Sequence, residues 1–331
     1  MRRFLKYHES YVLIVIVVLA IAITSINKQF FTLENLFDLL KSYSFLGILA
    51  VGVLIVLVSG GIDISFTAMT SVAEYVMAIY IINLKSNILI AFLISILVGI
   101  ALGAFNATLI HFLRIPTIIT TIATLNIYYG LLSFFSGGKW IYNLPDWFRN
   151  FSVIEVIKLV NREGIGYGLS IVTLIWIFVI LLAFFILRYT TLGRSIYAMG
   201  GNRISAQRVG LNILRLHFFV YCFMGLLSGI AAVVHALLVM NVAPNAIVGK
   251  ELDVIAAVVL GGANLAGGAG SLLGTIFGVI LVALMSNGIT LMRVSSLWYN
   301  VFIGLIIMVS VSMSAHQLKI KQRQRAVIDV E

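Results

Sequence analysis

Long apolar runs separated by short polar stretches are the dominant pattern of the chain. A hydrocarbon core about 30 Å thick is crossed by about 20 apolar residues in a helix. Ten segments approach this length: Tyr11–Ile26, Tyr43–Ser59, Ile64–Ile82, Ile88–His111, Pro116–Phe135, Tyr167–Leu187, His217–Met240, Leu252–Gly261, Ser271–Ile289 and Ser296–Ser314. Every backbone N–H and C=O group inside lipid needs a partner, so these runs predict helices. The pattern predicts an all-α polytopic membrane protein with about ten transmembrane helices, in a single domain of residues 1–331.

The eighth run, Leu252–Gly261, is too short to cross a membrane by itself. Either its helix begins earlier, near Ala243, or this span is a broken helix. Two connections are long enough to have roles of their own. Residues 136–166 are expected outside the cytoplasm, and residues 188–216 are expected inside it.

Composition supports the membrane class and excludes others. Hydrophobic residues make up 61% of the 331-residue chain and charged residues only 10%, against about 45–50% and about 25% in soluble domains. This balance excludes a soluble enzyme, a disordered hub and a nucleic-acid-binding module. The net charge of +10 is not evidence of nucleic-acid binding, because in a membrane protein Lys and Arg are distributed according to the side of the bilayer.

The distribution of charges predicts the orientation. With the N-terminus inside and one crossing per segment, the inner segments hold 13 of the 22 Lys and Arg residues and four of the 12 acids. The outer segments hold nine basic residues mixed with seven acids. Lys and Arg accumulate in cytoplasmic loops. Both termini are therefore expected in the cytoplasm, which requires an even number of spans.

The sequence contains no motif of catalysis or nucleotide binding. It has no G-x-x-x-x-G-K-[ST] phosphate loop and no G-x-S-x-G with suitable His and Asp partners. The five histidines are not at metal-ligand spacing with a cysteine or carboxylate, and Cys222 lies in an apolar run, as a buried hydrophobe would. We expect no enzyme activity, no metal site and no cofactor.

Small residues recur every four positions in three of the runs, and such stripes let helices approach closely in lipid. The stripes are Gly99, Gly103 and Ala107, then Gly225 and Gly229, then Gly270, Gly274 and Gly278. A further glycine cluster at residues 261–270 lacks a phosphate-binding lysine and predicts a tight re-entrant turn at the inner face. These patterns predict a tightly packed bundle.

Glu74 is the one acid expected inside a span. A charge at mid-bilayer costs about 2.5–3.5 kcal/mol on insertion scales, so such a residue usually faces a cavity or a partner. Three interpretations are open for Glu74: a proton site, a ligand for sugar hydroxyls, or a contact between helices with a neighbour such as Asn106 or Asn126. Uncharged polar residues within spans are further candidates for a solute path, although contacts between helices explain them equally well: Asn106, Asn126, Tyr128, Tyr129 and Asn287.

Four segments resemble the permeases of ribose-type ABC importers. Residues 59–65 read S-G-G-I-D-I-S, with Gly60, Gly61 and Asp63, and resemble the family's S-G-G-I-D-[LI]-S signature. Residues 116–121, P-T-I-I-T-T, resemble the segment after its fourth span. Residues 193–211, beginning G-R-S-I-Y-A-M-G-G-N, resemble its long cytoplasmic loop, and residues 260–288 resemble its C-terminal block.

The resemblance implies a fold and a set of partners. The fold would be that of vitamin-B12-type importer permeases. Two permease subunits, identical or paired, would form the pore in a bacterial cytoplasmic membrane. A separate cytoplasmic ATP-binding-cassette ATPase would drive it, and an extracellular or periplasmic binding protein would deliver a pentose, hexose or related solute. Autoinducer-2, a cyclic sugar-like signal, fits this family as well.

The inner connection of residues 188–216 is the expected docking element for the ATPase. It carries five arginines and no acid. A tight turn at Gly200 and Gly201 is expected, with Asn202 capping a short helix that ends near Gly210. The other interpretation is that the arginines only fix topology beside anionic lipid. The candidate coupling residues are Arg194, Gly200, Gly201, Asn202, Ala206 and Gly210.

Two positions depart from the family pattern. Thr67 and Ala68 stand where many members have Gly-Ser, at the start of the third predicted helix, and Ser205 replaces an alanine in the inner connection. The first change bears on solute specificity. The main alternative from another class is an ion-coupled secondary transporter that uses Glu74, for which inverted repeats with broken helices would be expected.

Overall fold

The computed structural model describes residues 8–83, 86–160, 164, 166–292, 295, 297–305 and 308. It confirms the all-α class, since eight helices of the described residues are long and apolar enough to cross a membrane. In chain order the elements are α1 (His8–Ile26), the 3-10 helix η2 (Lys28–Phe31), α2 (Leu33–Val58), α3 (Phe66–Asn83), α4 (Ile88–Phe112), α5 (Thr117–Ser136), α6 (Asp146–Ser152), β1 (Glu155–Val160), β2 (Gly166–Ser170), α7 (Ile171–Tyr189), α8 (Thr191–Gly201), α9 (Arg203–Arg208), α10 (Ile213–Val239), α11 (Lys250–Leu260) and α12 (Leu272–Leu291).

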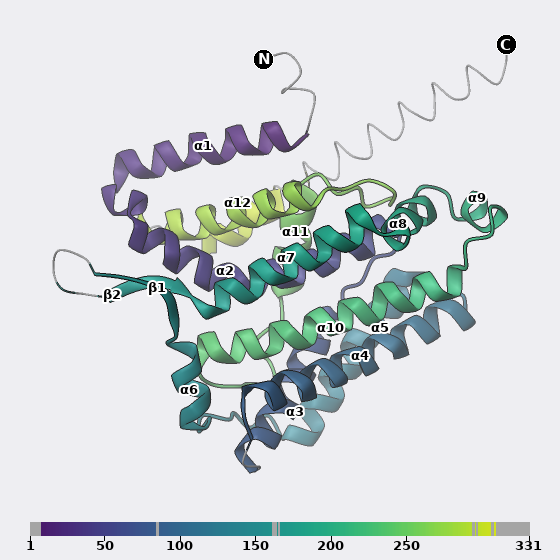
Figure 1. The fold of residues 1–331 in the computed structure, drawn as a ribbon, viewed down its shortest axis with the longest axis horizontal. Helices are drawn as coiled ribbons and strands as arrows, with labels where there is room; N and C mark the ends of the chain where they lie inside the picture. Colours follow the sequence, from purple (N-terminus) through teal and green to yellow (C-terminus); the bar gives the residue numbers. More distant parts are fainter. Residues whose placement is uncertain are drawn as a thin grey trace.

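The long helices run roughly side by side, and their connections gather at two ends of the molecule (Figure 1). One end carries α8 and α9 and is called the α8–α9 end. The other carries α6 and the β1–β2 hairpin and is called the hairpin end. Hydrogen bonds join distant helices at both ends. At the α8–α9 end Ser271 Oγ donates to Glu9 Oε1 at 2.7 Å, and at the hairpin end Asn287 Nδ2 donates to Asn35 Oδ1 at 3.1 Å.

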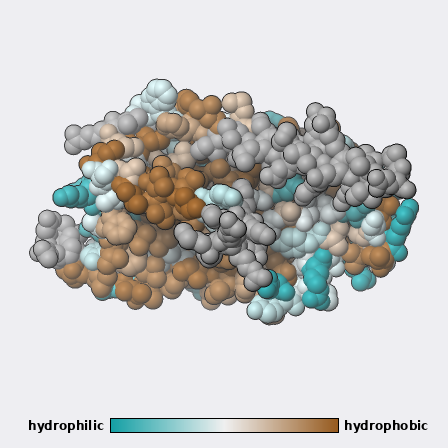
Figure 2. All heavy atoms as spheres, turned by 90° about the horizontal axis from the view of Figure 1, so that it is seen from above, coloured by the Kyte–Doolittle hydropathy of each residue, from teal (hydrophilic) through white to brown (hydrophobic). Residues whose placement is uncertain are grey.

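The core of the bundle forms around α2 and α10. Ile48, Leu49 and Leu54 of α2 have no solvent exposure, and they pack in one apolar cluster with side chains of α10 such as Met224 and Leu227. The outer helices α1, α4, α5 and α7 leave large apolar side chains uncovered. Figure 2 shows a broad band of hydrophobic side chains on one face, with hydrophilic ones mainly toward the two ends. This distribution matches a bundle surrounded by lipid.

Glycine contacts bring the helices close together, as their spacing predicts. A Cβ atom on Gly99 of α4 would lie 2.1 Å from the carbonyl oxygen of Gly225 in α10. A Cβ atom on Gly274 of α12 would lie 2.0 Å from the carbonyl oxygen of Gly261. Only a hydrogen atom fits at these distances. Gly270 departs from the expected stripe, because it precedes α12 and has a φ of +157°.

The short eighth run forms a short helix and not a full span. The helix α11 has 11 residues and begins at Lys250, which excludes a start near Ala243. Gly249, with a φ of +91°, ends the preceding turns, and Glu251 and Asp253 lie in the first helical turn, where carboxylates favour the positive end of a helix dipole. The expected tenth span, Ser296–Ser314, lies largely outside the described residues. Within this span, residues 297–305 are described and are helical.

The connection at residues 136–166 contains structure that the sequence did not predict. The strands β1 and β2 form an antiparallel hairpin, preceded by the short helix α6. Tyr167, expected to begin the sixth span, belongs to β2, and α7 begins at Ile171. Alternation of large apolar and polar residues is weak in this segment, so its strand pairing had no clear signal. The likeness to the vitamin-B12-type fold stays a prediction.

Candidate functional site

Three of the four family-like segments meet at the α8–α9 end through their glycines. Gly60 follows α2 with a φ of +84°, Gly200 lies in the last turn of α8, and Gly267 and Gly268 lie between α11 and α12. We call these four residues the glycine junction. A Cβ atom on Gly200 would lie 1.8 Å from the carbonyl oxygen of Val58. The junction therefore joins three distant parts of the chain by direct backbone contact.

Two hydrogen bonds strengthen the glycine junction. The backbone N–H of Gly268 donates to the carbonyl of Val58 at 2.9 Å, and the Tyr197 hydroxyl of α8 donates to the carbonyl of Gly270 at 2.8 Å. Burial raises the pKa of Tyr197 above its ordinary value of 10.0, so the hydroxyl keeps the proton that it donates. The position of α8 is thus set by backbone groups of the two segments it touches.

The α8–α9 segment has the capping that the sequence predicts. The side chain of Asn202 accepts a hydrogen bond from the backbone of Ser205 at 2.9 Å and begins α9. The helix ends at Arg208, and Gly210 follows with a φ of +86°, a conformation that favours glycine. The expected tight turn at Gly200 and Gly201 is wrong, because both residues belong to the last turn of α8.

Two large apolar side chains are exposed on α9 and at the residue that follows it. Ile204 is 66% exposed and Val209 is 78% exposed, whereas Ala206 between them is buried. Arg194 of α8 is also exposed. These two exposed aliphatic side chains lie beside exposed basic residues of the same segment.

Asp63 of the S-G-G-I-D-I-S segment begins a chain of buried hydrogen bonds. Its Oδ1 accepts from the Ser65 backbone N–H at 2.8 Å and from the Ser65 hydroxyl at 2.7 Å. Asn106 Nδ2 donates to Ser65 Oγ at 2.7 Å, and the Tyr128 hydroxyl lies 3.0 Å from Asn106 Oδ1. This chain links the segment before α3 to α4 and α5. Burial raises the pKa of Asp63 to about 6.

Two of the solute-path candidates, Asn106 and Tyr128, are therefore engaged in the protein interior. Asn106 has no solvent exposure and Tyr128 is 4% exposed. Asn287 of α12 exchanges hydrogen bonds with Asn35 of α2 near the hairpin end, and Tyr129 is half-buried. The bonds of Asn106, Tyr128 and Asn287 match the contact between helices that the sequence left open for such residues, whereas the Tyr129 hydroxyl is buried without a hydrogen-bond partner among the described residues.

Asn126 differs from the other candidates because its side chain is exposed on α5. Its amide donates only to the carbonyl of Ile122, one turn earlier, at 2.8 Å. A Cβ atom on Gly130, one turn later, would meet nothing within 4 Å. An exposed amide in a membrane span favours a watery path or a protein partner over lipid.

Glu74 is paired with a histidine that the sequence did not connect to it. His235 Nδ1 lies 2.9 Å from Glu74 Oε1 and 3.1 Å from Oε2, and it joins α10 to α3. The Phe45 ring packs against the imidazole with centroids 4.9 Å apart. The neighbour of Glu74 is thus His235, and not Asn106 or Asn126. The 161 residues between the two side chains leave no local spacing that could have revealed the pair.

A second buried contact lies at the start of α3. The hydroxyl of Thr67 donates to Glu251 Oε1, in the first turn of α11. The sequence placed Glu251 among the outer acids, whereas it is 7% exposed in the bundle. Thr67 is also one of the positions that depart from the family pattern, so the departure supplies a hydroxyl for this contact.

Comparison with known proteins assigns the chain to a family of transport proteins. The profile of the family described as "Branched-chain amino acid transport system / permease component" matches residues 35–311. No solved structure matches the chain significantly. The matched range includes the glycine junction, the Asp63 hydrogen-bond chain and the Glu74–His235 pair.

Curated relatives include two kinds of import permease. The ribose import permease of Escherichia coli K12 is 32% identical over 305 residues, which cover 92% of each chain. The ribose import permease of Haemophilus influenzae is 30% identical over 311 residues, 93% of each chain. An autoinducer 2 import permease of Photorhabdus luminescens is 30% identical over 303 residues, 92% of this chain and 88% of its own. The resemblance is therefore confirmed, and the chain belongs to the permease family of ribose-type ABC importers.

Proposed function

We propose that the chain is the membrane-spanning permease subunit that carries a small sugar or sugar-like solute across a bacterial cytoplasmic membrane. The observation that carries this function is the construction of the α8–α9 end. Exposed Ile204 and Val209 stand on a segment whose base is joined to α2 and to the α11–α12 connection through the glycine junction. A partner that moves α9 therefore acts directly on the helices of the bundle.

The partner at α9 is a separate ATP-binding-cassette ATPase. The sequence has no phosphate-binding loop of its own, so the energy of ATP hydrolysis comes from another chain. The basic residues around α9 suit an acidic or polar cleft on that partner.

The α8–α9 end faces the cytoplasm, and both termini lie on that side. Among the described residues this end carries two acids, Glu9 and Asp63, against six arginines. Those arginines are Arg114, Arg188, Arg194, Arg203, Arg208 and Arg215. The hairpin end faces outward, where an extracellular or periplasmic binding protein delivers the solute.

The solute path runs along the exposed face of α5 that contains Asn126 and Gly130. A second permease subunit, a copy or a sister chain, covers this face and completes the pore. The relatives import ribose or autoinducer 2, and neutral amides bind hydroxyl groups of such molecules without the cost of moving a charge from water. This supports a small polyhydroxylated solute as the cargo.

Reconstitution tests the proposal. The chain would be placed in liposomes with the ATPase and the binding protein of its importer, and uptake of radiolabelled ribose would be measured, with autoinducer 2 as the second solute. We expect uptake to require ATP and to persist with a protonophore, while the chain alone hydrolyses no ATP. Uptake that ignores ATP and collapses with the protonophore would instead establish the ion-coupled alternative, with Glu74 as the ion site.

A further inference from the structure

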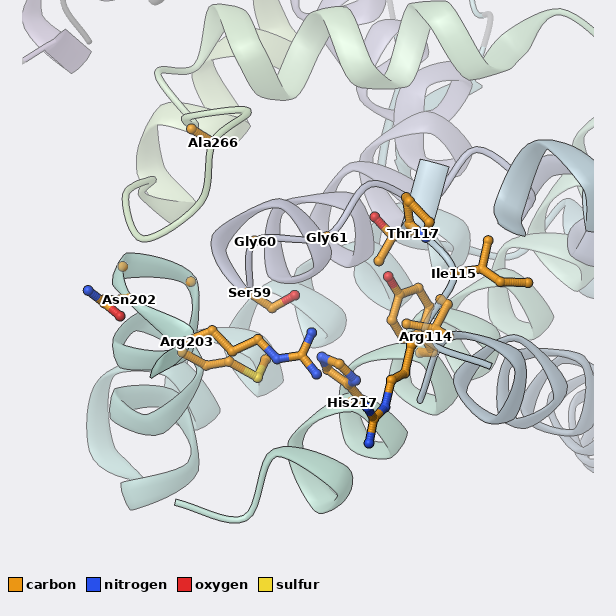
Figure 3. Close-up of a pocket in the computed structure, with 16 residues that line it drawn as sticks. Ser59, Gly60, Gly61, Arg114, Ile115, Thr117, Asn202, Arg203, His217 and Ala266 are labelled. Atoms are coloured by element: carbon orange, nitrogen blue, oxygen red, sulfur yellow. The ribbon is translucent and has the colours of Figure 1, made fainter. Parts of the chain in front are cut away.

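A cavity of about 420 Å³ opens beside the glycine junction and the start of α9. Its charged and imidazole side chains come from three places, which are the connection between α4 and α5, the α8–α9 junction and the first turns of α10. The end of α2 and Ala266 of the α11–α12 connection complete the walls. Figure 3 shows the side chains of Arg114, Arg203 and His217, one from each wall, directed into the same hollow. The volume lies in the range of about 300–1,000 Å³ that is usual for small-ligand sites.

The charge in this cavity is positive and uncompensated. None of its 16 lining residues is acidic. Neither Arg114 nor Arg203 forms an ion pair with a described residue. Two guanidinium groups beside one small cavity repel each other, and a bound anion would relieve that repulsion. The carboxyl of Asp63 lies close enough to interact electrostatically with Tyr221 of the lining, but Asp63 does not itself line the cavity and forms no ion pair with Arg114 or Arg203.

The start of α5 adds neutral donors to the cavity. Pro116 and Thr117 line it, and no side chain caps this 20-residue helix. The first N–H groups of a helix have no partner within the helix, and they favour anions.

The imidazole of His217 is an independent indication of a ligand. His217 is only 8% exposed, yet its Nδ1 atom has no hydrogen-bond partner among the described residues. Buried polar atoms are nearly always paired.

We propose that this cavity binds a phosphate group, held by Arg114, Arg203, His217 and the start of α5. The donors approach from three walls, which suits a tetrahedral oxyanion with several acceptor oxygens, whereas one arginine fork already satisfies a planar carboxylate. The cavity is larger than an orthophosphate ion, so it has room for a phosphate that carries an organic group. Either a phosphate ester from the cytoplasm or the headgroup of an anionic lipid presents this chemistry.

Binding to the purified full-length chain tests the proposal. The chain, in detergent and phosphate-free buffer, would be titrated with inorganic phosphate and with ribose 5-phosphate, with chloride at equal ionic strength as the reference, and bound ³¹P or ³²P would be measured. Separately, thermal stability would be compared in nanodiscs of phosphatidylglycerol and of phosphatidylcholine. The variants are Arg114→Gln and Arg203→Gln, with Arg208→Gln as the matched control on α9, outside the cavity.

We expect saturable binding of one phosphate per chain, weakened about tenfold or more by either cavity variant and unchanged by Arg208→Gln. Arg203→Lys, which keeps the charge but loses the fork, should fall between wild type and Arg203→Gln. If the soluble probes do not bind but phosphatidylglycerol stabilises the chain through Arg114 and Arg203 alone, the phosphate comes from lipid.

The proposal is wrong if neither form of phosphate binds, in which case an acidic side chain of a partner remains the counterion. It is also wrong if Arg208→Gln weakens binding as much as Arg203→Gln does, because the effect is then general electrostatics.

Discussion

Nδ1 of His235 lies 2.9 Å from Oε1 of Glu74, and among the described residues this is the only basic–acidic side-chain contact at ion-pair distance that joins two spans. Glu74 is 1% exposed and His235 is 12% exposed, so the carboxyl is closed off from lipid and water while the imidazole is partly buried. The contact fixes α3 against α10 in the interior of the bundle.

Glu74→Leu should strongly destabilise the protein, because it leaves the imidazole of His235 buried without its partner. Breaking a buried pair on one side costs about 3–5 kcal/mol. Glu74→Gln should lose much less and retain much of the transport, because an amide still bonds to the imidazole. The measurement is thermal unfolding in detergent, together with solute uptake.

The double variant Glu74→Leu with His235→Leu is the control for this prediction. It removes both polar groups, so it should be more stable than either single leucine variant. Loss of all uptake in a well-folded Glu74→Gln protein would instead identify a proton site, and normal uptake by Glu74→Leu would leave Glu74 with no role in transport.

Gly200→Ala should destabilise the glycine junction, whereas Gly201→Ala should not. The added methyl at residue 200 would lie 1.8 Å from the carbonyl oxygen of Val58, a backbone atom that cannot turn away, while at residue 201 it meets nothing within 4 Å. Overpacking costs about 1–3 kcal/mol. The two apparent melting temperatures check this, and equal values for these neighbouring substitutions would contradict the close contact.

Ile204→Asp and Val209→Asp should weaken binding of the ATPase about tenfold or more, because both side chains are exposed and apolar. Neither change alters a basic residue, so membrane topology should persist. Co-purification of the ATPase with the permease is the measurement. Val153→Asp, at an exposed apolar position of the hairpin end, is the control and should bind the ATPase normally; a similar loss there would show that the effect is not local.

Asp63→Asn should change stability in a way that depends on pH. Burial raises the pKa of Asp63 from 3.8 to about 6. The folded state then holds a proton that the unfolded state releases, so this carboxyl lowers stability as pH rises from about 4 to 6. Relative to wild type, Asp63→Asn should gain about 3 kcal/mol between pH 4 and pH 7.5. Parallel melting curves of the two proteins across this range would contradict the shift.

Asn126→Leu should reduce uptake without changing the thermal stability of the single chain, because the amide bonds only to its own helix. Asn83→Leu is the matched control. Asn83 Nδ2 makes the same bond one turn back, to Ile79 at 2.9 Å, at the end of α3. Reduced uptake in the Asn83 variant, or normal uptake in the Asn126 variant, would remove α5 from the solute path.

The membrane class, most spans and the close helix packing followed from the sequence, because each rests on a local signal. An apolar run must become a helix in lipid. Gly99 and Gly225 lie on stripes of small residues, which are explained by close packing of helices. The cap at Asn202 is local as well. Such features depend on residues within a few turns of one another.

The partners of buried polar groups could not be predicted in this way. His235 is 161 residues from Glu74, and Thr67 is 184 residues from Glu251. Lone polar residues in apolar runs look alike until the helices are placed beside one another. The same holds for Gly200, whose role was read as a turn, although the carbonyl of Val58 beside it is what requires a glycine.

The glycine junction places no side chains between the backbones of the segments that it joins. Side chains between two helices can change rotamer and absorb a small displacement, but a Cα atom against a carbonyl group cannot. The backbone N–H of Gly268 also donates a hydrogen bond to the carbonyl of Val58, the same carbonyl that Gly200 contacts. A displacement of α9 should therefore be transmitted to the end of α2 with little loss.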